Sequence, residues 1–360
     1  MNKLKIFNLM ISTDPEGQGG IATVVMGYQQ SKLIDDMRFI SISPHSSSNR
    51  NKVSAIVQFI LSLIKITFYG VFNKLGIAHI HMASRGSYTR KSIIIRLTKF
   101  LGAKTIIHLH GGEFETFYSK ECSERKKQHI RATFDMADRI IVLSKSSLEC
   151  VNTIVNNVDK VCIVYNASPE ITLPKRSSEQ KNILFLGRLS QNKGVEDLID
   201  AFAKITSTHP DIQLQLAGDG DITRYKTQAI QLGIASRVDF LGWISGEAKR
   251  QCLANATIYC LPSYHEALGM GILEAMSANV VVVATNVGGI PDVIENGKEG
   301  ILVEAGNVDA LAIALSTMLE NDELRAQYVN AAKSKYRLNF SPNIIIPQLN
   351  DIYKELLEEK

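Results

Sequence analysis

The stretch that decides the fold spans residues 261–295 and reads LPSYHEALGMGILEAMSANVVVVATNVGGIPDVIE. The apolar run that leads into it, 257–261, is typical of a buried parallel strand. A Pro-Ser pair ends that strand, and a helix is expected over 269–278. A helix that begins among glycines at the carboxyl end of a strand exposes unpaired N–H groups and the positive end of its dipole. We therefore predict an anion site at this helix N-terminus.

Two carboxylates bracket the predicted anion site, because Glu266 precedes the helix and Glu274 lies about one turn inside it. A carboxylate repels phosphate but accepts hydrogen bonds from neutral hydroxyls such as those of a sugar or a ribose. A second apolar strand, 280–284, leads to a second glycine-rich turn, 287–292, and both turns are expected to point at one crevice. The pattern favours a nucleotide-sugar ligand, and the alternative is an ordinary α/β turn with solvated charges.

The stretch resembles the nucleotide-sugar motif of retaining glycosyltransferases of family 4, which have the two-domain GT-B fold. Their pattern is P-S-x-x-E-G-F-G-x-x-x-x-E-A-M-A-x-G-x-P-V-V-A, followed by G-G-x-x-E/D. The residues that match it are Pro262, Ser263, Glu266, Gly269, Glu274, Ala275, Met276, Gly288, Gly289 and Asp292. The residues that depart from it are Ala267, Leu268, Asn279 and Val281. The resemblance places Ala267 and Leu268 beside the donor sugar, and Asn279 can still adopt a left-handed turn.

The size and the cysteines indicate a globular protein of a reducing compartment. A chain of 360 residues with 45% hydrophobic and 21% charged residues is expected to form about two globular domains. Its five cysteines are scattered without zinc-type or C-x-x-C spacing, so we interpret them as buried thiols in a reducing cytoplasm. The basic and apolar first ten residues lack a signal-peptide cleavage pattern. We expect a cytoplasmic protein, with peripheral attachment to the inner face of the membrane as a further hypothesis.

The net charge of +4 hides an asymmetry between the halves of the chain. Residues 1–170 contain 22 Lys and Arg against 13 Asp and Glu, whereas residues 171–360 contain 18 against 23. A basic first half indicates an anionic partner, such as a membrane surface, a lipid-linked phosphate or nucleic acid. No zinc finger, RNP-type motif or basic run with interleaved aromatics is present, so nucleic acid is not expected.

Strand and helix patterns alternate along the first half of the chain, which predicts a doubly wound α/β domain. The predicted strands are 4–11, 38–43, 77–81, 105–109, 139–143 and 160–164, and the predicted helices are 21–34, 52–73, 89–100, 120–136 and 146–155. The resemblance implies a GT-B fold, with two Rossmann-like domains that face each other across a deep cleft. The expected division is an acceptor-binding domain at 1–168, a linker at 169–180, a nucleotide-sugar domain at 181–340 and a final helix at 341–360 that crosses back to the first domain.

Residues 53–72 form the most apolar helical stretch of the chain. Their length would allow a membrane span, but Gln58, Lys65 and several hydroxyl side chains argue against one. We favour a helix buried in the α/β domain, with an in-plane membrane helix as the alternative. In that alternative, Phe59 and Leu63 are predicted to contact lipid.

Three glycine or basic loops of the first domain are candidates for substrate binding. The resemblance places Gly19 and Gly20 against the donor diphosphate, and the cleft histidine of the family corresponds to His110, beside Gly111. His110 is expected to contact the transferred sugar. No third ligand with suitable spacing indicates a metal there. Three basic residues near the helix that starts at 84–89 suggest an acceptor phosphate site that includes Arg85, Ser87 and Arg90, and a solvated helix start is an equal alternative.

The second domain begins with a strand and the loop 187–194, which matches the family motif G-R-x-x-x-x-K-G. Arg188 and Lys193 in this loop are suited to neutralise a diphosphate, the first by a forked contact and the second as a point charge. The other donor-site candidates that the resemblance implies are Gly218, Trp243, Ile244, Leu268, Gly269, Met270 and Gly271.

The resemblance implies retaining, metal-independent transfer of a hexose or N-acetylhexosamine from a nucleotide-diphospho-sugar, with UDP favoured over GDP. Arg188, Lys193, Glu266 and His110 are the expected catalytic residues. The basic first half favours a saccharide or lipid-linked acceptor, as in bacterial capsule or O-antigen synthesis. The alternatives are a nucleotide-sugar 2-epimerase, for which only Glu113 and Glu115 offer acidic groups, and a non-catalytic membrane-docked subunit.

Overall fold

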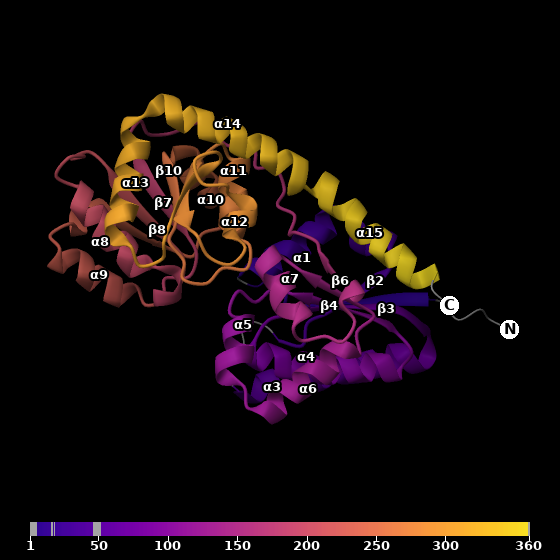
Figure 1. Cartoon of the computed structure of the whole chain (residues 1–360). Coiled ribbons are helices and arrows are strands. Elements are labelled where there is room, and N and C mark those ends of the chain that lie inside the picture. The colour runs from indigo at the N-terminus through magenta and orange to yellow at the C-terminus, as the bar shows by residue number, and fades with distance from the viewer. Residues whose placement is uncertain (1–5, 16, 18, 46–51, 359–360) are drawn as a thin grey trace. The chain divides into compact units, whose positions relative to one another are not determined.

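The computed structural model describes residues 6–15, 17, 19–45 and 52–358, and it divides the chain into two compact units (Figure 1). Unit 1 comprises Met1–Ala167 together with Pro342–Lys360, and unit 2 comprises Ser168–Ser341. Within the described residues, each unit contains one parallel sheet of six strands. The predicted doubly wound α/β class is confirmed.

The sheet of unit 1 has the strand order β2-β1-β3-β4-β5-β6. Its strands are β1 (Ile6–Ile11), β2 (Phe39–Ile42), β3 (Lys74–Met82), β4 (Lys104–Leu109), β5 (Arg139–Val142) and β6 (Val161–Ile163). The chain leaves β1 toward β2 and returns on the other side at β3, so β1 and β3 form the topological switch point. In such sheets, ligands bind at the carboxyl ends of the two switch strands.

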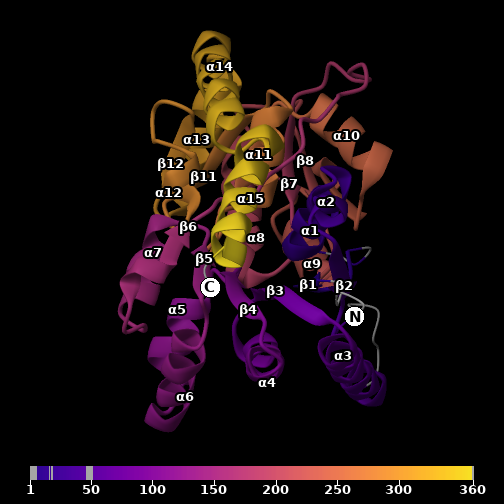
Figure 2. The ribbon, with the colours of Figure 1, turned by 90° about the vertical axis from the view of Figure 1, so that its right-hand side faces the viewer.

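The helices of unit 1 cover both faces of this sheet. They are α1 (Gly20–Gln30), α2 (Leu33–Asp36), α3 (Lys52–Phe72), α4 (Arg85–Phe100), α5 (Phe114–Thr116), α6 (Glu124–Asp135), α7 (Lys145–Asn152) and α15 (Pro342–Glu358). Figure 2 shows α3, α4 and α6 side by side, and contacts of α3 and α4 with β3 place them on one face. On the opposite face, Tyr28 of α1 and Tyr353 of α15 pack against His79 of β3.

The predicted elements of unit 1 agree with the structure apart from their ends. The predicted helix 21–34 is two helices, because Lys32 has a positive φ of 63° and interrupts the helical backbone. The predicted helix at 89–100 begins earlier, at Arg85. The first two residues of the strand predicted at 4–11 lie outside the described residues.

The helix α3 corrects the expectation of a buried helix. Only Ser62 and Ile66 among its described side chains are fully buried. Nine large apolar side chains are at least 49% exposed, and they are Val53, Ile56, Val57, Ile60, Leu61, Ile64, Phe68, Val71 and Phe72. Their spacing of three and four residues places them on one broad face, which we call the α3 apolar face. Phe59 and Leu63, predicted to contact lipid, instead pack partly buried against the core of unit 1.

The sheet of unit 2 has the order β12-β11-β10-β7-β8-β9, which is the strand order of the dinucleotide-binding Rossmann fold. Its strands are β7 (Asn182–Leu186), β8 (Gln213–Ala217), β9 (Val238–Gly242), β10 (Ile258–Leu261), β11 (Val281–Thr285) and β12 (Gly300–Val303). The chain turns back between the neighbours β7 and β10, so these strands form the switch point. The two motif-bearing loops of the sequence follow these two strands.

The helices of unit 2 are α8 (Val195–Ile205), α9 (Ile222–Gln231), α10 (Gly246–Asn255), α11 (Met270–Ser277), α12 (Ile290–Val293), α13 (Val308–Glu320) and α14 (Asp322–Asn339). The segment predicted as a linker, 169–180, has no helix or strand and is held to unit 2. The backbone N–H of Ile171 donates to Ser277 Oγ, and Ser177 is hydrogen-bonded to Asn255. The final helix α15 is grouped with unit 1 through its contacts with β3.

Candidate functional site

The loops after β7 and β10 meet at the switch point of unit 2. Lys193 Nζ donates to Glu266 Oε2 over 2.5 Å, so the cation of the first motif and the carboxylate of the second are in contact. The backbone holds them together, because Tyr264 N donates to Asn192 O over 2.9 Å. Gly194 has a φ of 66°, and a Cβ atom there would lie 1.9 Å from Pro262 O. Only glycine therefore allows the two loops to approach this closely.

Arg188 lies at the start of the same loop. Its side chain is exposed, and among the described residues it makes no ion pair or hydrogen bond. An exposed guanidinium without an acidic partner retains all its donors for an anion. The structure thus offers one uncompensated cation, Arg188, beside the ion pair of Lys193 and Glu266.

Glu274 has a basic partner that the sequence did not reveal. Lys249 Nζ of α10 donates to Glu274 Oε1 over 2.7 Å, and the glutamate side chain is only 11% exposed. The nearly buried carboxylate is thereby kept in one position in the absence of ligand. Lys249 belongs to no motif, and it lies 25 residues before Glu274, so only the tertiary structure brings the pair together.

The N-terminus of α11 has the geometry expected for an anion site. Gly269 caps the helix with a φ of 90°, and the amide groups of Met270 and Gly271 have no partner within the helix. Tyr259 Oη donates to Leu186 O, and a Cβ atom at Gly271 would lie 2.0 Å from Tyr259 Oη. Burial, and then the charges of Glu274 and Glu266, raise the pKa of Tyr259 well above its usual value, so it stays a neutral donor.

The second glycine-rich turn acts on Glu266 through the backbone. Gly289 N donates to Glu266 O over 3.1 Å, and a Cβ atom at Gly288 would lie 1.9 Å from that oxygen. The helix that follows, α12, has only four residues. The structure therefore gives this turn a supporting function for Glu266, and not that of a second helix N-terminus facing the ligand.

The remaining predicted donor residues lie on the neighbouring loops of unit 2. Gly218 packs against the carbonyl of Gly187, next to Arg188, at a point where a Cβ atom would clash at 1.7 Å. Trp243 follows the edge strand β9 and is 44% exposed, and Ile244 beside it is half-buried. Leu268 is 1% exposed, so its side chain belongs to the core and not to an open sugar-binding surface. Asn279 has the expected left-handed conformation, with a φ of 58°.

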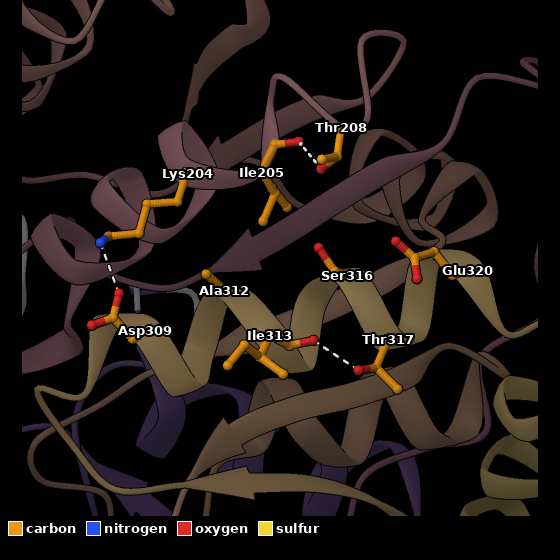
Figure 3. Close-up of a pocket in the computed structure, with 9 residues that line it drawn as sticks. All are labelled: Lys204, Ile205, Thr208, Asp309, Ala312, Ile313, Ser316, Thr317 and Glu320. Carbon is orange, nitrogen blue, oxygen red and sulfur yellow. Dashed lines mark hydrogen bonds and ion pairs between the residues drawn. The ribbon is translucent and has the colours of Figure 1, made fainter.

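A separate cavity of about 560 Å³ lies between α8 and α13 (Figure 3). Its lining residues are Lys204, Ile205, Thr208, Asp309, Ala312, Ile313, Ser316, Thr317 and Glu320. None of these residues belongs to the motifs or follows a switch strand. Lys204 is bonded to Asp309 at its rim, with both side chains largely exposed. We therefore place the candidate site at the switch-point loops and not in this cavity.

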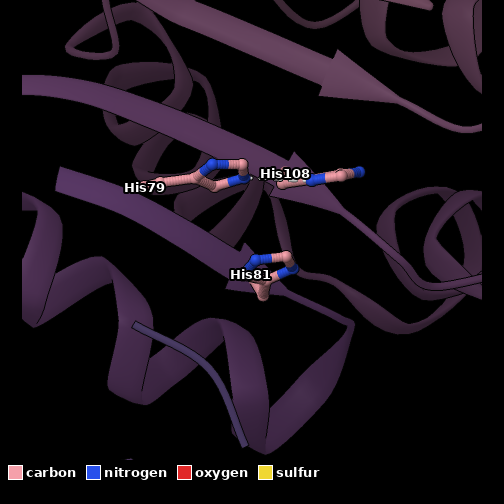
Figure 4. A group of neighbouring side chains, drawn as sticks. All are labelled: His79, His81 and His108. Carbon is pink, nitrogen blue, oxygen red and sulfur yellow. Dashed lines mark hydrogen bonds between the residues drawn. The ribbon is translucent and has the colours of Figure 1, made fainter. Parts of the chain in front are cut away.

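Four histidines of unit 1 form a stacked cluster on one face of β3 and β4. His79 and His81 of β3 lie with their ring planes within 3° of parallel and their centroids 4.6 Å apart. His108 and His110 extend the stack from the neighbouring strand, and Figure 4 shows three of the four rings together. His79 is hydrogen-bonded to Tyr353 over 2.6 Å and to His108 over 3.0 Å. Alternate residues of paired strands share a face, which explains the arrangement.

The hydrogen bonds of His81 fix the tautomer of His110. Burial lowers the pKa of His110 to about 3, and burial together with the neighbouring histidines lowers that of His81 well below its usual value, so both rings are neutral near pH 7. His81 Nε2 faces the sulfur of Met10 over 3.2 Å, and a thioether only accepts, so this nitrogen carries the proton. His81 Nδ1 then accepts from His110 Nε2 over 2.7 Å. His110 Nδ1 is left as an acceptor, suited to a sugar hydroxyl.

The cluster also bears on the question of a metal. Nitrogen atoms of His79, His81 and His108 lie within 4.8 Å of one another, so tertiary pairing supplies the third ligand that sequence spacing did not show. His79 Nε2 is hydrogen-bonded to His108 Nδ1, and His81 Nδ1 to His110 Nε2, whereas a metal would require the lone pairs to converge on one point. We interpret the cluster as a hydrogen-bonded support for His110. Independence from metal stays a prediction.

The predicted acceptor residues of unit 1 differ in how their charges are compensated. Arg85 is ion-paired with both Glu113 and Glu121, so its charge is already balanced. Ser87 Oγ accepts a hydrogen bond from Ala83 N, and Gly111 packs against the backbone of Ala83 and Ser84. Arg90 has no ionic partner among the described residues. Gly19 and Gly20 are exposed at the N-terminus of α1.

Comparison with known proteins places these sites in context. Residues 171–335 match the family described as glycosyl transferases group 1. A phosphatidyl-myo-inositol mannosyltransferase of Mycobacterium leprae is 32% identical over 62% of this chain and 58% of its own length. The chain thus spans less than two thirds of that relative.

Two solved structures share the fold over nearly the whole chain. A sucrose-phosphate synthase from Thermosynechococcus elongatus superposes with a TM-score of 0.83 at 17% identity, and it covers 99% of this chain and 100% of its own. The Anabaena protein HepE, solved with UDP and glucose, gives a TM-score of 0.77 at 17% identity, over 98% of this chain and 100% of its own. The predicted GT-B fold is confirmed.

Proposed function

Because residues 171–335 match the group 1 glycosyltransferases, we propose that this chain transfers a hexosyl or N-acetylhexosaminyl group from a nucleotide-diphospho-sugar, with retention at the anomeric carbon. The observation that carries the proposal is the arrangement of Arg188, Lys193 and Glu266 on the loops of the two switch strands of unit 2. The acceptor that we favour is a saccharide or a lipid-linked molecule of bacterial capsule or O-antigen synthesis, at the cytoplasmic face of the membrane.

The residues of unit 2 account for the steps of such a transfer. When the donor bond breaks, negative charge grows on the diphosphate, and Arg188, Lys193 and the free N–H groups of α11 can stabilise it. Glu274 accepts hydrogen bonds from the ribose and Glu266 from the donor sugar. The acceptor hydroxyl attacks from the side on which the diphosphate departs, and the leaving phosphate takes its proton. Two cations, Arg188 and Lys193, can perform the neutralisation that a metal performs in other transferases, which supports metal-independent transfer.

The alternatives fit the geometry less well. An epimerase needs an acidic general base, but Glu113 is already committed to an ion pair with Arg85. A non-catalytic subunit has no need for an uncompensated Arg188 beside a preformed Lys193–Glu266 pair. Both observations favour the transferase.

Isothermal titration of the protein with UDP, GDP and ADP tests the donor site. We expect micromolar binding of one diphosphate, with UDP first because the fold relative HepE was solved with it. Arg188→Ala removes a contact to the diphosphate, and Glu274→Ala removes a contact to the ribose. We expect each variant to weaken binding by about tenfold or more. Addition of a chelator should leave the affinity unchanged. Folded protein that binds none of the three diphosphates would refute the proposal.

The α3 apolar face supports attachment to an anionic membrane. Nine exposed apolar side chains on one helix are unusual for a surface in water. Residues 51–100, which include α3 and α4, contain eight Lys and Arg and no Asp or Glu, so the surroundings of the face are attracted to anionic lipid.

The other face of α3 argues for docking in the membrane plane. The stretch Val53–Phe72 has a mean hydropathy of 1.9 and the length of a membrane span. However, Gln58 Nε2 and Ser62 Oγ both donate to Ser43 O, and Ile66 is fully buried against unit 1. A span would break these contacts. An in-plane helix keeps them and still places its apolar face in the lipid.

Vesicle flotation tests the docking. The triple variant Ile60→Asn, Ile64→Asn and Phe68→Asn removes three side chains that are each expected to contribute more than 1 kcal/mol on burial in lipid. We expect binding to vesicles with anionic lipid to fall by about a hundredfold. The control changes three exposed apolar residues of unit 2, Ile230, Ile313 and Leu338, to Asn and should bind normally. Undiminished flotation of the folded α3 variant would exclude docking through this face.

A further inference from the structure

Lys91 is a buried ammonium group without a partner. Its side chain is on the inner face of α4, the residue is 4% exposed, and Nζ makes no hydrogen bond to any described residue. An isolated buried charge is costly, because the lost hydration is not replaced. Such a group calls for an explanation, and an anionic ligand that pairs with it is one.

The neighbours of Lys91 increase its need for an anion. Arg90 is half-buried, and its Nε is also buried without a hydrogen bond. No carboxylate of the described residues forms an ion pair with either side chain. Burial, and then the positive charge of Arg90, lower the pKa of Lys91 to about 7. His45, which follows β2, is close enough that burial and the charges of Arg90 and Lys91 lower its pKa too.

The position of the cluster connects it with the candidate site of unit 1. The helix α4 follows β3, one of the two switch strands, and Lys91 is close enough to His81 for its charge to lower the pKa of that ring. His81 is the hydrogen-bond partner of His110. Cations, the cleft histidine and the carboxyl end of a switch strand thus lie in one region, where an acceptor would bind.

We propose that Lys91 and Arg90 form a subsite for a phosphoryl group of the acceptor, with Arg90 as the forked donor and Lys91 as the point charge behind it. This inference rests on the proposed function, and it moves the anion contact away from Arg85, whose charge Glu113 and Glu121 already balance. The phosphoryl group has two sources, a membrane lipid or a soluble phosphate ester. Both present the same oxygen atoms to the cluster.

Titration with inorganic phosphate and with glycerol 3-phosphate tests the subsite. The protein is first saturated with UDP, so that added phosphate cannot bind at Arg188 and Lys193. We expect the Lys91→Met and Arg90→Gln variants to lose at least about tenfold in affinity, which corresponds to about 1.4 kcal/mol. The control Arg96→Gln, an exposed cation of the same helix, should bind as the original protein does.

Thermal unfolding supplies a readout that separates the subsite from a structural function. Lys91→Met removes an unpaired buried charge, so we expect a higher Tm without phosphate and no further rise when phosphate is added. A lower Tm of Lys91→Met, together with unchanged affinity for phosphate and for vesicles, would overturn the inference.

Vesicles containing phosphatidylglycerol distinguish the two sources of the phosphoryl group. If Lys91→Met weakens binding of soluble phosphate, the result supports a phosphate ester. If it weakens only binding to vesicles, the result supports a lipid headgroup. If neither probe depends on Lys91, the subsite does not exist. UDP binding is measured on the same samples, so failure of the donor site and failure of this subsite are recorded separately.

Discussion

Lowering the pH from 7.5 to 5.5 should destabilise unit 1 by about 5 kcal/mol, a large share of the stability of an ordinary domain. The cause is the histidine cluster, since burial holds the pKa of His79 and His110 at about 3 and those of His81 and His108 well below 6.5. In the unfolded chain all four rings take up protons below about pH 6.5, whereas the folded rings do not. The contribution of the four histidines to the free energy of unfolding is therefore fully present above about pH 6.5. Below that pH it falls by about 1.4 kcal/mol per histidine per pH unit.

Urea denaturation followed by circular dichroism at the two pH values measures this effect. Hydrogen exchange of peptides from 74–109 and 258–285 assigns it to unit 1 or unit 2. The variant His108→Asn keeps a polar partner for His79 but removes one of the four titrating rings. The free energy of unfolding should therefore depend on pH about a quarter less steeply, whatever the absolute stability of the variant. Equal urea midpoints at pH 7.5 and 5.5 for the original protein would show that the rings are not held neutral.

Replacing Lys193 with methionine should weaken binding of the preferred nucleoside diphosphate by about a hundredfold. A charge-assisted hydrogen bond to phosphate contributes up to about 3 kcal/mol. The substitution also frees Glu266, which Lys193 holds at 2.5 Å, and leaves its negative charge beside the diphosphate. Loss of attraction and gain of repulsion act in the same direction.

A double-mutant cycle separates the two effects. Glu266→Gln in the Lys193→Met background removes the repulsion, so part of the affinity should return. Lys204→Met is the matched control, because Lys204 pairs with Asp309 in an exposed position by the α8–α13 cavity and should not affect binding. A loss of less than about threefold in Lys193→Met would remove Lys193 from the diphosphate site.

The sequence predicted the architecture because its signals are local. Apolar runs that end in polar or glycine-rich turns mark parallel strands, and the strands predicted at 257–261 and 280–284 agree with β10 and β11 to within one residue at each end. The motifs 187–194 and 261–295 also predicted that Lys193 and Glu266 act together. In this strand order, β7 and β10 are the switch strands, so the loops that follow them meet.

The environment of α3 could not be derived from its sequence. A run of twenty apolar residues is compatible with a buried helix, a membrane span or an exposed apolar face, because periodicity does not say how much of a helix its neighbours cover. Coverage depends on how far α4 and the sheet extend beside it. Only the fold showed that Phe59 and Leu63 pack inward while Ile60 and Ile64 remain exposed.

The sequence by itself determined the two-unit α/β fold and the loops that carry Arg188, Lys193, Glu266, Glu274 and His110. The tertiary structure alone decided which charges are compensated: Arg85 by two glutamates, Glu274 by Lys249, and Lys91 by no described residue. The physical reason is that a motif specifies a strand end and the loop after it, whereas the energy of a charge depends on burial and on partners from distant parts of the chain.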